Sequence, residues 1–469
     1  MPNNEYLVTN AELTATADAI RVKTGSSSPI EWKSNSGFAD SVDSIPTSRI
    51  EADYGKPVKF FDYDGFLVYS YTPEELAALT AMPDNPSHEG LTAQGWNWTL
   101  AQAQTYVASY GQLNIGQMYT SSDGKTKIHI RINDGRLIPY LGLAVNGSAD
   151  IDWGDGSAHD TLSGSSLSDA VYVAHSYASA GEYTISVDVT GNASIVGSTN
   201  GSYLLRRSNV GDSGNDDKIY ESAIISVNIG DNMEVGDYAF QNCYSLITIT
   251  IPHSATSIGS YVFHSCYSFR GLTLPDSITS TGRNIMMNCY SATSVAFSSS
   301  VTSVARNAFQ GCNSLSSVSI PDSITSFTSY LFSGCHSLAS IVVPLTVSTI
   351  ETYVFQSCYS LSFVKFYRST PPVCSNMNAW GVSSDFKIIY PYEGTIAYKS
   401  ATNYPDKDTY LYLGFYSGTD GEVLPTTVTD GIITYNLTWF ATIDDAFSGV
   451  SPITTMQGTE VYCRSVLVS

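Results

Sequence analysis

The sequence has little positive charge and no long apolar run. Only 22 residues are Lys or Arg, against 43 that are Asp or Glu, which gives a net charge of −21 at pH 7. A surface this acidic repels a nucleic-acid backbone, so we expect no nucleic-acid partner. Nowhere do about 20 apolar residues follow one another, the length that a membrane-spanning helix needs, so we expect no membrane insertion.

Spacings typical of metal sites and catalytic centres are also missing. No two cysteines are separated by two residues, the commonest spacing of zinc ligands. We therefore predict no metal site and no cofactor. No pair or triad of acid, base and nucleophile recurs in a suitable context, which favours a protein that is not an enzyme.

What the sequence does contain is a repeat of constant length. Six of its eight cysteines are 23 residues apart, and each follows a Phe or a Met by three residues. The cysteines are Cys243, Cys266, Cys289, Cys312, Cys335 and Cys358, and the residues before them are Phe240, Phe263, Met286, Phe309, Phe332 and Phe355. A constant period of this size is typical of a solenoid, in which each coil buries its apolar face against its neighbours.

Each coil also carries the pattern of a short strand. After each cysteine come three apolar positions, which in one coil are Leu315, Val318 and Ile320. The last two alternate with polar residues, as in a strand with one buried face. In four coils a proline ends this strand, because a residue without an N–H cannot continue the ladder. We expect the Phe and Met positions to stack as a second internal ladder.

The sequence of the repeats resembles that of a known family. Residues 320–326 (Ile-Pro-Asp-Ser-Ile-Thr-Ser) and 332–338 (Phe-Ser-Gly-Cys-His-Ser-Leu) resemble the BspA-type leucine-rich repeats of bacterial surface proteins and some phage tail proteins. Residues 389–404 resemble the segment that often closes such an array, whose last coil needs a cover. We expect a solenoid with its C-terminal cap over residues 225–412.

The repeated cysteines are predicted to be buried free thiols. Equivalent side chains of adjacent coils point the same way, which does not suit disulfide geometry, whereas a thiol packs well as a small hydrophobe. His264 and His336 lie near cysteines at coil positions that other repeats fill with Gln, Met, Tyr or Asn, which disfavours a metal site. Cys374 and Cys463 could pair only if the C-terminal tail folds back.

Residues 1–48 are predicted to be a short helical segment. A capping box at residues 9–12 opens a helix. Its apolar face consists of Leu13, Ala17 and Ile20. Residues 7–25 resemble the N-terminal segments of tail-associated proteins from phages of Gram-positive gut bacteria, which implies that this end attaches to a virion. The alternative is an ordinary helix that packs on its own chain.

Residues 49–122 are predicted to form a small α+β domain. Within it, Asp62 and Asp64 have the spacing of the first motif of haloacid-dehalogenase-type phosphatases, which this stretch resembles. Alternating apolar residues on both sides of Asp64-Gly65 instead favour a β-hairpin, and no later partners for phosphate or Mg²⁺ are evident.

Two helices and two tryptophans complete this domain. Thr72 and Thr99 each begin a helix with a capping box, and the second helix should end at Gly111. Trp96 and Trp98 are expected in the core, with carbohydrate stacking as the alternative role.

Residues 123–195 resemble a PKD-type β-sandwich, a kind of module that usually spaces or presents other domains. The resemblance rests on Ile-Asp-Trp-Gly-Asp-Gly at 151–156, His-Ser-Tyr at 175–177 and the alternating strand at 181–187. It implies that His175 has a structural role. Residues 196–224 are predicted to be a linker, and residues 413–469 a small C-terminal β unit of undecided role.

Two rows of polar and aromatic residues are the candidate binding surfaces of the solenoid. The position after each cysteine holds Tyr244, Tyr267, Tyr290, Asn313, His336 and Tyr359. Another position holds Tyr238, Tyr261, Asn284, Asn307, Tyr330 and Tyr353, of which Tyr261, Tyr330 and Tyr353 are the candidates for binding. Tyrosine among Ser, Thr and Asn is favoured in recognition surfaces. The alternative is that these side chains merely cover the coil edges.

The sequence therefore predicts a multidomain, mainly β, non-enzymatic protein of a phage tail. Its first residues lack the basic and apolar segments of a signal peptide, so we expect a virion protein made in the host cytoplasm. Its N-terminus should bind other tail proteins, its repeats should bind a host cell-surface protein or glycan, and it should be a homo-oligomer, with a trimer weakly favoured. The alternatives are a structural virion component (baseplate, collar or head decoration) and a bacterial surface adhesin.

Overall fold

The fold is described by a computed structural model. It covers residues 53–133, 138–206 and 222–376, then 380, 386–391, 397–398 and 401–404, and the backbone of four strands between 411 and 467. The N-terminal segment with Leu13, Ala17 and Ile20 lies outside the described residues. The architecture is mainly β, as predicted, and its helix content is 6%.

The first described domain combines a four-stranded sheet with two helices. Its elements are β1 (Val58–Phe61), β2 (Leu67–Tyr71), α3 (Pro73–Ala77), β3 (Leu91–Trp96), α4 (Leu100–Tyr110) and β4 (Leu113–Ser121), and the strand order is β2-β1-β4-β3. Both predicted capping boxes are present, at Thr72 and Thr99. α4 ends at Gly111, where a φ of 75° suits a residue without a Cβ.

The hairpin interpretation of Asp62 and Asp64 is confirmed. β1 and β2 pair antiparallel, and Gly65 occupies the turn with φ 80°. The Asp64 carboxylate accepts a hydrogen bond from the backbone N–H of Phe66 (3.2 Å). The carboxylate of Asp62 is buried and lies 2.8 Å from Nε2 of His88. Both carboxylates therefore support the structure of the hairpin.

The next part of the chain continues directly into the solenoid. Its strands are β5 (Thr126–Ile132), β6 (Tyr140–Asp152), β7 (Asp160–Ala174), β8 (Gly181–Ile195), β9 (Gly197–Ser198), β10 (Gly201–Ser202) and β11 (Leu205–Arg206). Part of the predicted linker thus forms strands. β5 to β8 and β11 share one eight-stranded sheet with the first solenoid strands, and β5 pairs antiparallel with β12 (Ile224–Asn228).

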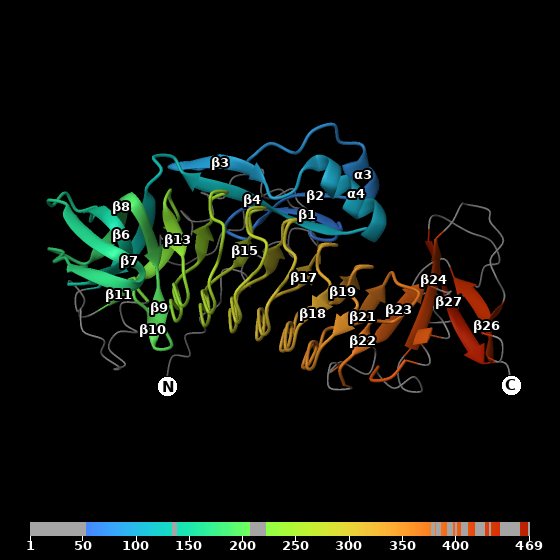
Figure 1. The fold of residues 1–469 in the computed structure, drawn as a ribbon. Coiled ribbons are helices and arrows are strands. Elements are labelled where there is room, and N and C mark those ends of the chain that lie inside the picture. The colour runs from blue at the N-terminus through green and yellow to red at the C-terminus, as the bar shows by residue number, and fades with distance from the viewer. Residues whose placement is uncertain are drawn as a thin grey trace, which may run out of the picture. The chain divides into compact units, whose positions relative to one another are not determined.

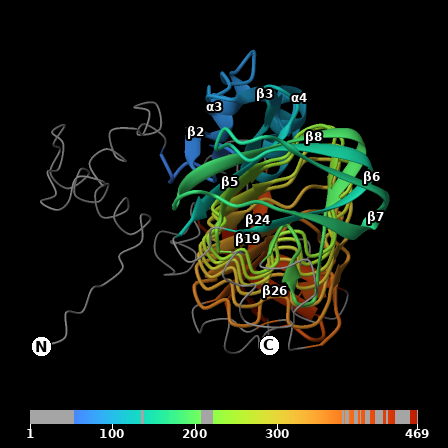
Figure 2. The same cartoon turned by 90° about the vertical axis from the view of Figure 1, so that its left-hand side faces the viewer.

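A β-solenoid of about seven turns spans residues 226–389. Its strands after β12 are β13 (Met233–Val235), β14 (Thr248–Thr250), β15 (Gly271–Thr273), β16 (Ser294–Ala296), β17 (Ser317–Val318), β18 (Ser326–Phe327), β19 (Ser340–Val343), β20 (Thr349–Ile350), β21 (Phe363–Phe366), β22 (Val373–Cys374) and β23 (Lys387–Pro391). Neighbouring coils pair parallel in the predicted register, so that Leu272 faces Val295 and Val295 faces Val318. Seen along its axis, the solenoid shows its coils superposed (Figure 2).

The Phe and Cys ladders are internal, as predicted. All six Phe and Met positions have at most 1% of their surface exposed, and Phe309 and Phe332 stack with ring centroids 5.8 Å apart. The six cysteines are buried free thiols. From the second coil on, each thiol donates to the carbonyl of the Phe or Met one coil earlier, as Cys335 does to Phe309 (3.2 Å). The cysteines therefore join consecutive coils without any disulfide.

Four C-terminal strands extend the sheet of the last coils. They are β24 (Leu411–Ser417), β25 (Thr427–Asp430), β26 (Ile433–Phe440) and β27 (Glu460–Leu467), and β24 pairs parallel with β23. Trp380 stacks on Phe355 (5.3 Å between centroids) and so ends the Phe ladder. Cys374 is a buried free thiol, so it forms no disulfide with Cys463.

The α+β domain packs along the strands of the solenoid, on one side of it in both views (Figures 1 and 2). β4 contacts β14, β15, β16 and β17. The amide nitrogen of Asn97 donates to the carbonyls of Leu274 (3.1 Å) and Ala296 (3.0 Å), and its oxygen accepts from the N–H of Gly116. The domain therefore ties several coils together.

Several strand positions that the alternation pattern assigns to solvent are buried. At most 7% of the surface is exposed at Thr250, Ser294, Ser319 and Lys365. The hydroxyl of Ser319 accepts a hydrogen bond from the N–H of Asn114 in β4 (2.8 Å). Strands β14 to β17 of the solenoid are thus covered by β4 of the same chain.

Candidate functional site

The row of residues that follows the cysteines forms an aromatic stack on the surface. We call it the tyrosine row: Tyr244, Tyr267, Tyr290, Asn313, His336 and Tyr359. Ring centroids of Tyr244 and Tyr267, and of Tyr267 and Tyr290, are 4.9 Å apart, and those of His336 and Tyr359 are 5.1 Å apart. The spacing is that of neighbouring strands, because each coil contributes one ring.

Three tyrosines of the tyrosine row are widely exposed, and so is His336. Tyr267, Tyr290 and Tyr359 have 41%, 40% and 64% of their surface exposed. Among the described residues only four other large apolar or aromatic side chains are exposed, and they belong to different positions: Tyr54, Ile138, Leu345 and Val373. Single exposed apolar residues are common, whereas several at one repeated position form a patch.

The stacking determines which parts of the rings a partner can contact. Each inner ring covers part of its neighbour's face, so the accessible parts are the ring edges and the faces at the ends of each stack. Asn313 separates the two stacks. With its amide nitrogen turned inward, it donates to the carbonyls of Gly311 (3.2 Å) and Gly334 (2.9 Å). Tyr290 and His336 therefore end their stacks on either side of a small polar residue.

The second row has a different environment. All six of its residues have φ from 59° to 62°: Tyr238, Tyr261, Asn284, Asn307, Tyr330 and Tyr353. Asn tolerates this left-handed conformation, but it strains a bulky side chain. Tyr330 and Tyr353 stack at 4.7 Å and are only partly exposed, as is Tyr261. Of the two candidate rows, the tyrosine row is therefore the more accessible.

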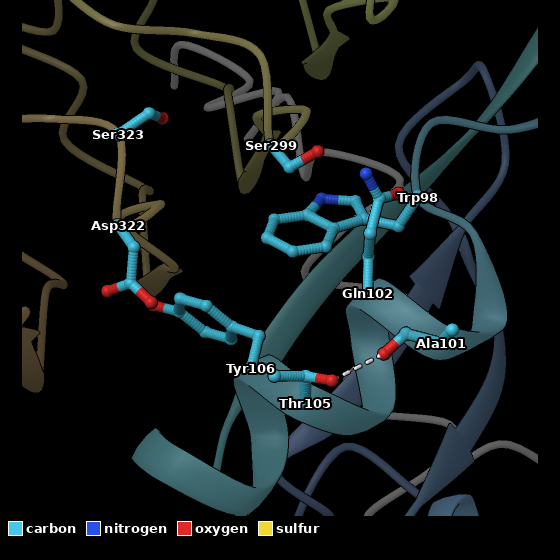
Figure 3. Close-up of a pocket in the computed structure, with 8 residues that line it drawn as sticks. All are labelled: Trp98, Ala101, Gln102, Thr105, Tyr106, Ser299, Asp322 and Ser323. Carbon is cyan, nitrogen blue, oxygen red and sulfur yellow. Dashed lines mark hydrogen bonds between the residues drawn. The ribbon is translucent and has the colours of Figure 1, made fainter.

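A cleft lies between α4 and the solenoid (Figure 3). Its volume is about 360 Å³, and it is lined by Trp98, Ala101, Gln102, Thr105, Tyr106, Ser299, Asp322 and Ser323. The indole N–H of Trp98 donates to the carbonyl of Phe297 (2.6 Å), and the hydroxyl of Tyr106 to that of Ile320 (2.6 Å). Sequence reasoning missed this site because its two walls are far apart in the chain.

His175 and Asp155 come together as a structural pair. Nε2 of His175 lies 2.8 Å from Oδ2 of Asp155, and its ring stacks on the fully buried Trp153 (4.6 Å between centroids). Hydrogen bonds from Ser157 and from His175 lower the pKa of Asp155 to about 2. The imidazole thus packs against the core tryptophan, as its predicted role requires.

Within the described residues, no cluster of three His, Cys, Asp or Glu side chains could hold a metal ion. The described helices include none that is long and apolar enough to cross a membrane.

Comparison with known proteins identifies the repeats. Residues 233–362 match the BspA type leucine rich repeat region, in six copies. The solenoid is thus similar to BspA-type repeats, and the predicted resemblance is confirmed for this part of the chain. No curated protein sequence matches the chain.

Three solved bacterial structures are similar to about a third of the chain, at low identity and low TM-score. A leucine-rich repeat protein of Bacteroides ovatus is 22% identical (TM-score 0.28), with 35% of this chain and 48% of that one covered. A leucine rich cell surface protein of Faecalibacterium prausnitzii is 20% identical (TM-score 0.27), with 36% and 61% covered. The T. pallidum leucine-rich repeat protein is 19% identical (TM-score 0.25), with 35% and 78% covered. The match thus spans about half of the Bacteroides ovatus protein.

Proposed function

We propose that this chain is a non-enzymatic adhesion protein that binds a host cell surface through the tyrosine row. The observation that carries the proposal is the exposure of Tyr267, Tyr290 and Tyr359, which recur at one position of consecutive or nearby coils. Aromatic rings of this kind bury a large area at low entropic cost, which suits recognition. β4 covers strands β14 to β17, whereas these three tyrosines are exposed.

We further propose that the protein is carried on a phage tail. The support is the resemblance of residues 7–25 to phage tail-associated proteins, and the BspA-type repeats, which occur in some of them. In this proposal residues 1–48 bind other tail proteins, and the chain assembles as a homo-oligomer, such as a trimer.

Binding of the purified full chain to cells tests the adhesion role. Fluorescently labelled protein should bind the bacterium that the phage infects, saturate with concentration, and compete with unlabelled protein. Absence of binding, together with normal adsorption of virions that lack the chain, would overturn the proposal.

Imaging separates this role from that of a structural virion component. Gold-labelled antibodies against the solenoid should mark the exposed tip of the tail. Labelling restricted to the head, the collar or an enclosed part of the baseplate would contradict receptor binding, and labelling of the bacterial surface without phage would favour the adhesin alternative.

A further inference from the structure

Strand β7 forms an edge of the large sheet. Among the described strands it pairs only with β6 (Figure 1), whereas β6 also pairs with β8 and β11 on its other side. The last regular part of β7 is residues 170–174 (Ala-Val-Tyr-Val-Ala), because a bulge at residues 166–169 interrupts the pairing with β6 before it. A sheet edge of this kind can accept a further strand.

The backbone hydrogen bonds show which groups of β7 point to this edge. In an antiparallel pair, residues that bond the partner strand alternate with residues whose N–H and C=O point to the other side. Gly142 of β6 lies opposite Tyr172, but its N–H donates away from β7, to the carbonyl of Leu204 (3.1 Å). Ala170 and Ala174, two residues to either side of Tyr172, therefore direct their N–H and C=O away from β6, toward the open edge.

The side chains of this segment hold the edge in place without blocking it. Val171 and Val173 pack against the hydrophobic core, and the ring of Tyr172 lies against Gly142, where a Cβ would overlap it. Natural proteins often block a free edge with Lys, Pro or an inward-pointing charge. Residues 170–174 contain none of these and consist of types that favour strands, apart from two alanines.

We propose that two copies of the chain pair through residues 170–174, antiparallel about a twofold axis at Tyr172. Ala170 of each copy then lies opposite Ala174 of the other, and the backbones of each such pair exchange two hydrogen bonds. Asp169 lies opposite His175 at both ends, so no like charges meet.

A second copy suits this edge because the segment reads the same in both directions. In the proposed register Val171 lies opposite Val173 on the core side of the sheet, and the two Tyr172 rings meet on the other side. Both faces are therefore self-complementary, as an interface with twofold symmetry requires. This interface shares no residue with the tyrosine row, so the inference stands or falls independently of the proposed adhesion function.

Sedimentation velocity of the full chain over a wide concentration range tests the proposal. The wild type should show an equilibrium between monomer and dimer. Ala174→Pro should weaken the dimer at least tenfold, because it removes an N–H that points across the interface and leaves the hydrogen bonds to β6 intact. The matched control Ala174→Ser keeps this N–H at the same exposed position and should dimerise like the wild type. Both variants should keep the melting temperature of the wild type within a few degrees.

Crosslinking through an introduced cysteine gives a second readout that does not depend on the proline. In Tyr172→Cys the two new thiols lie on either side of the twofold axis, at a Cα separation of about 5.5 Å that a disulfide can bridge. Mild oxidation should therefore yield a covalent dimer. The control Ser163→Cys, at an exposed position of β7 beyond the bulge, should yield none, and neither should the wild type, whose described cysteines are all buried.

Three results would overturn the proposal: a wild type that stays monomeric at every concentration, a dimer or trimer that Ala174→Pro leaves unchanged, or equal crosslinking of the two cysteine variants. If Ala174→Pro lowers the melting temperature strongly, the crosslinking of Tyr172→Cys decides. A monomeric wild type that still binds host cells would contradict the dimer alone and leave the proposed adhesion function intact.

Discussion

Single residues stabilise the solenoid through ladders that run from coil to coil. Phe309 lies inside the ladder between Met286 and Phe332 and is 1% exposed. Its carbonyl accepts from the N–H of Cys312 and the thiol of Cys335. One Phe thus connects its own coil to the next through both its ring and its backbone.

Replacing this ring measures the strength of the ladder. Phe309→Ala should lower the free energy of unfolding by about 3–5 kcal/mol, because it leaves a large cavity among stacked rings. Denaturant titration followed by circular dichroism gives the value. The control is Tyr359→Ala at an exposed position, which should change stability by less than about 0.5 kcal/mol. An unchanged midpoint for Phe309→Ala would contradict the internal placement of the ring.

The buried thiols should be chemically inert in the folded protein. Burial raises the pKa of Cys312 and of Cys358 to about 12, so the reactive thiolate is scarce at neutral pH. Iodoacetamide at pH 8 should leave all six ladder cysteines unmodified in the native protein and modify them in concentrated urea, as peptide mass spectrometry would show. Rapid labelling of Cys312 in the native state would place it at the surface.

Asp155 gives the β5–β8 region a dependence on pH. Its pKa of about 2 in the folded protein lies below the usual value of 3.8, so its bonds stabilise the fold above pH 4 and are lost as the pH falls toward 2. Asp155→Asn should therefore lower the melting temperature at pH 7, and the difference from the wild type should shrink toward pH 2. A difference that stays constant with pH would contradict this role of the carboxylate.

At the scale of elements, the sequence predicts those features that neighbouring residues determine. The capping boxes at Thr72 and Thr99, the hairpin around Gly65 and the strand of each coil follow from local pattern, and all are present. The packing of β4 on the solenoid was not predictable in this way. Asn97 bonds to Leu274, 177 residues away, and nothing in either segment marks the other as its partner.

Gly116 tests how closely β4 lies against the coils. A Cβ at this position would overlap the side chain of Thr273 in β15. Gly116→Ala should therefore destabilise the protein by roughly 1–3 kcal/mol through overpacking and increase hydrogen exchange in α4 and β4. Gly181→Ala is the control, since its nearest neighbour would be an ordinary 3.5 Å contact with Tyr183. Equal effects of the two substitutions would argue against close packing at this interface.

The candidate sites show the same limit of prediction. The period of the cysteines was enough to identify Tyr267, Tyr290 and Tyr359 as one row, and their exposure agrees with it. The separate character of the second row was not recognised, although Asn284 and Asn307 at two of its positions are of the residue type that tolerates the left-handed backbone found at Tyr261. The cleft at Asp322 was invisible for the same reason as the packing of β4.

At the scale of the whole molecule, different surfaces of the solenoid have different roles. The strand face holds the α+β domain, the interior holds the Phe and Cys ladders, and the tyrosine row is left for a partner. Weak contacts repeated along a rigid surface add up when all of them meet one partner, so substitutions spread along the row should act together.

The most direct test substitutes the row and measures binding of the full chain to host cells. The triple variant Tyr267→Ser, Tyr290→Ser, Tyr359→Ser should lose at least 90% of the cell binding of the wild type. Hot-spot residues of an interface typically change the affinity by roughly tenfold or more when they are truncated. Its melting temperature should stay close to that of the wild type, because all three side chains are exposed. The control Tyr54→Ser, Val373→Ser removes two exposed side chains outside the row and should bind normally. Full binding by the triple variant would contradict the central claim.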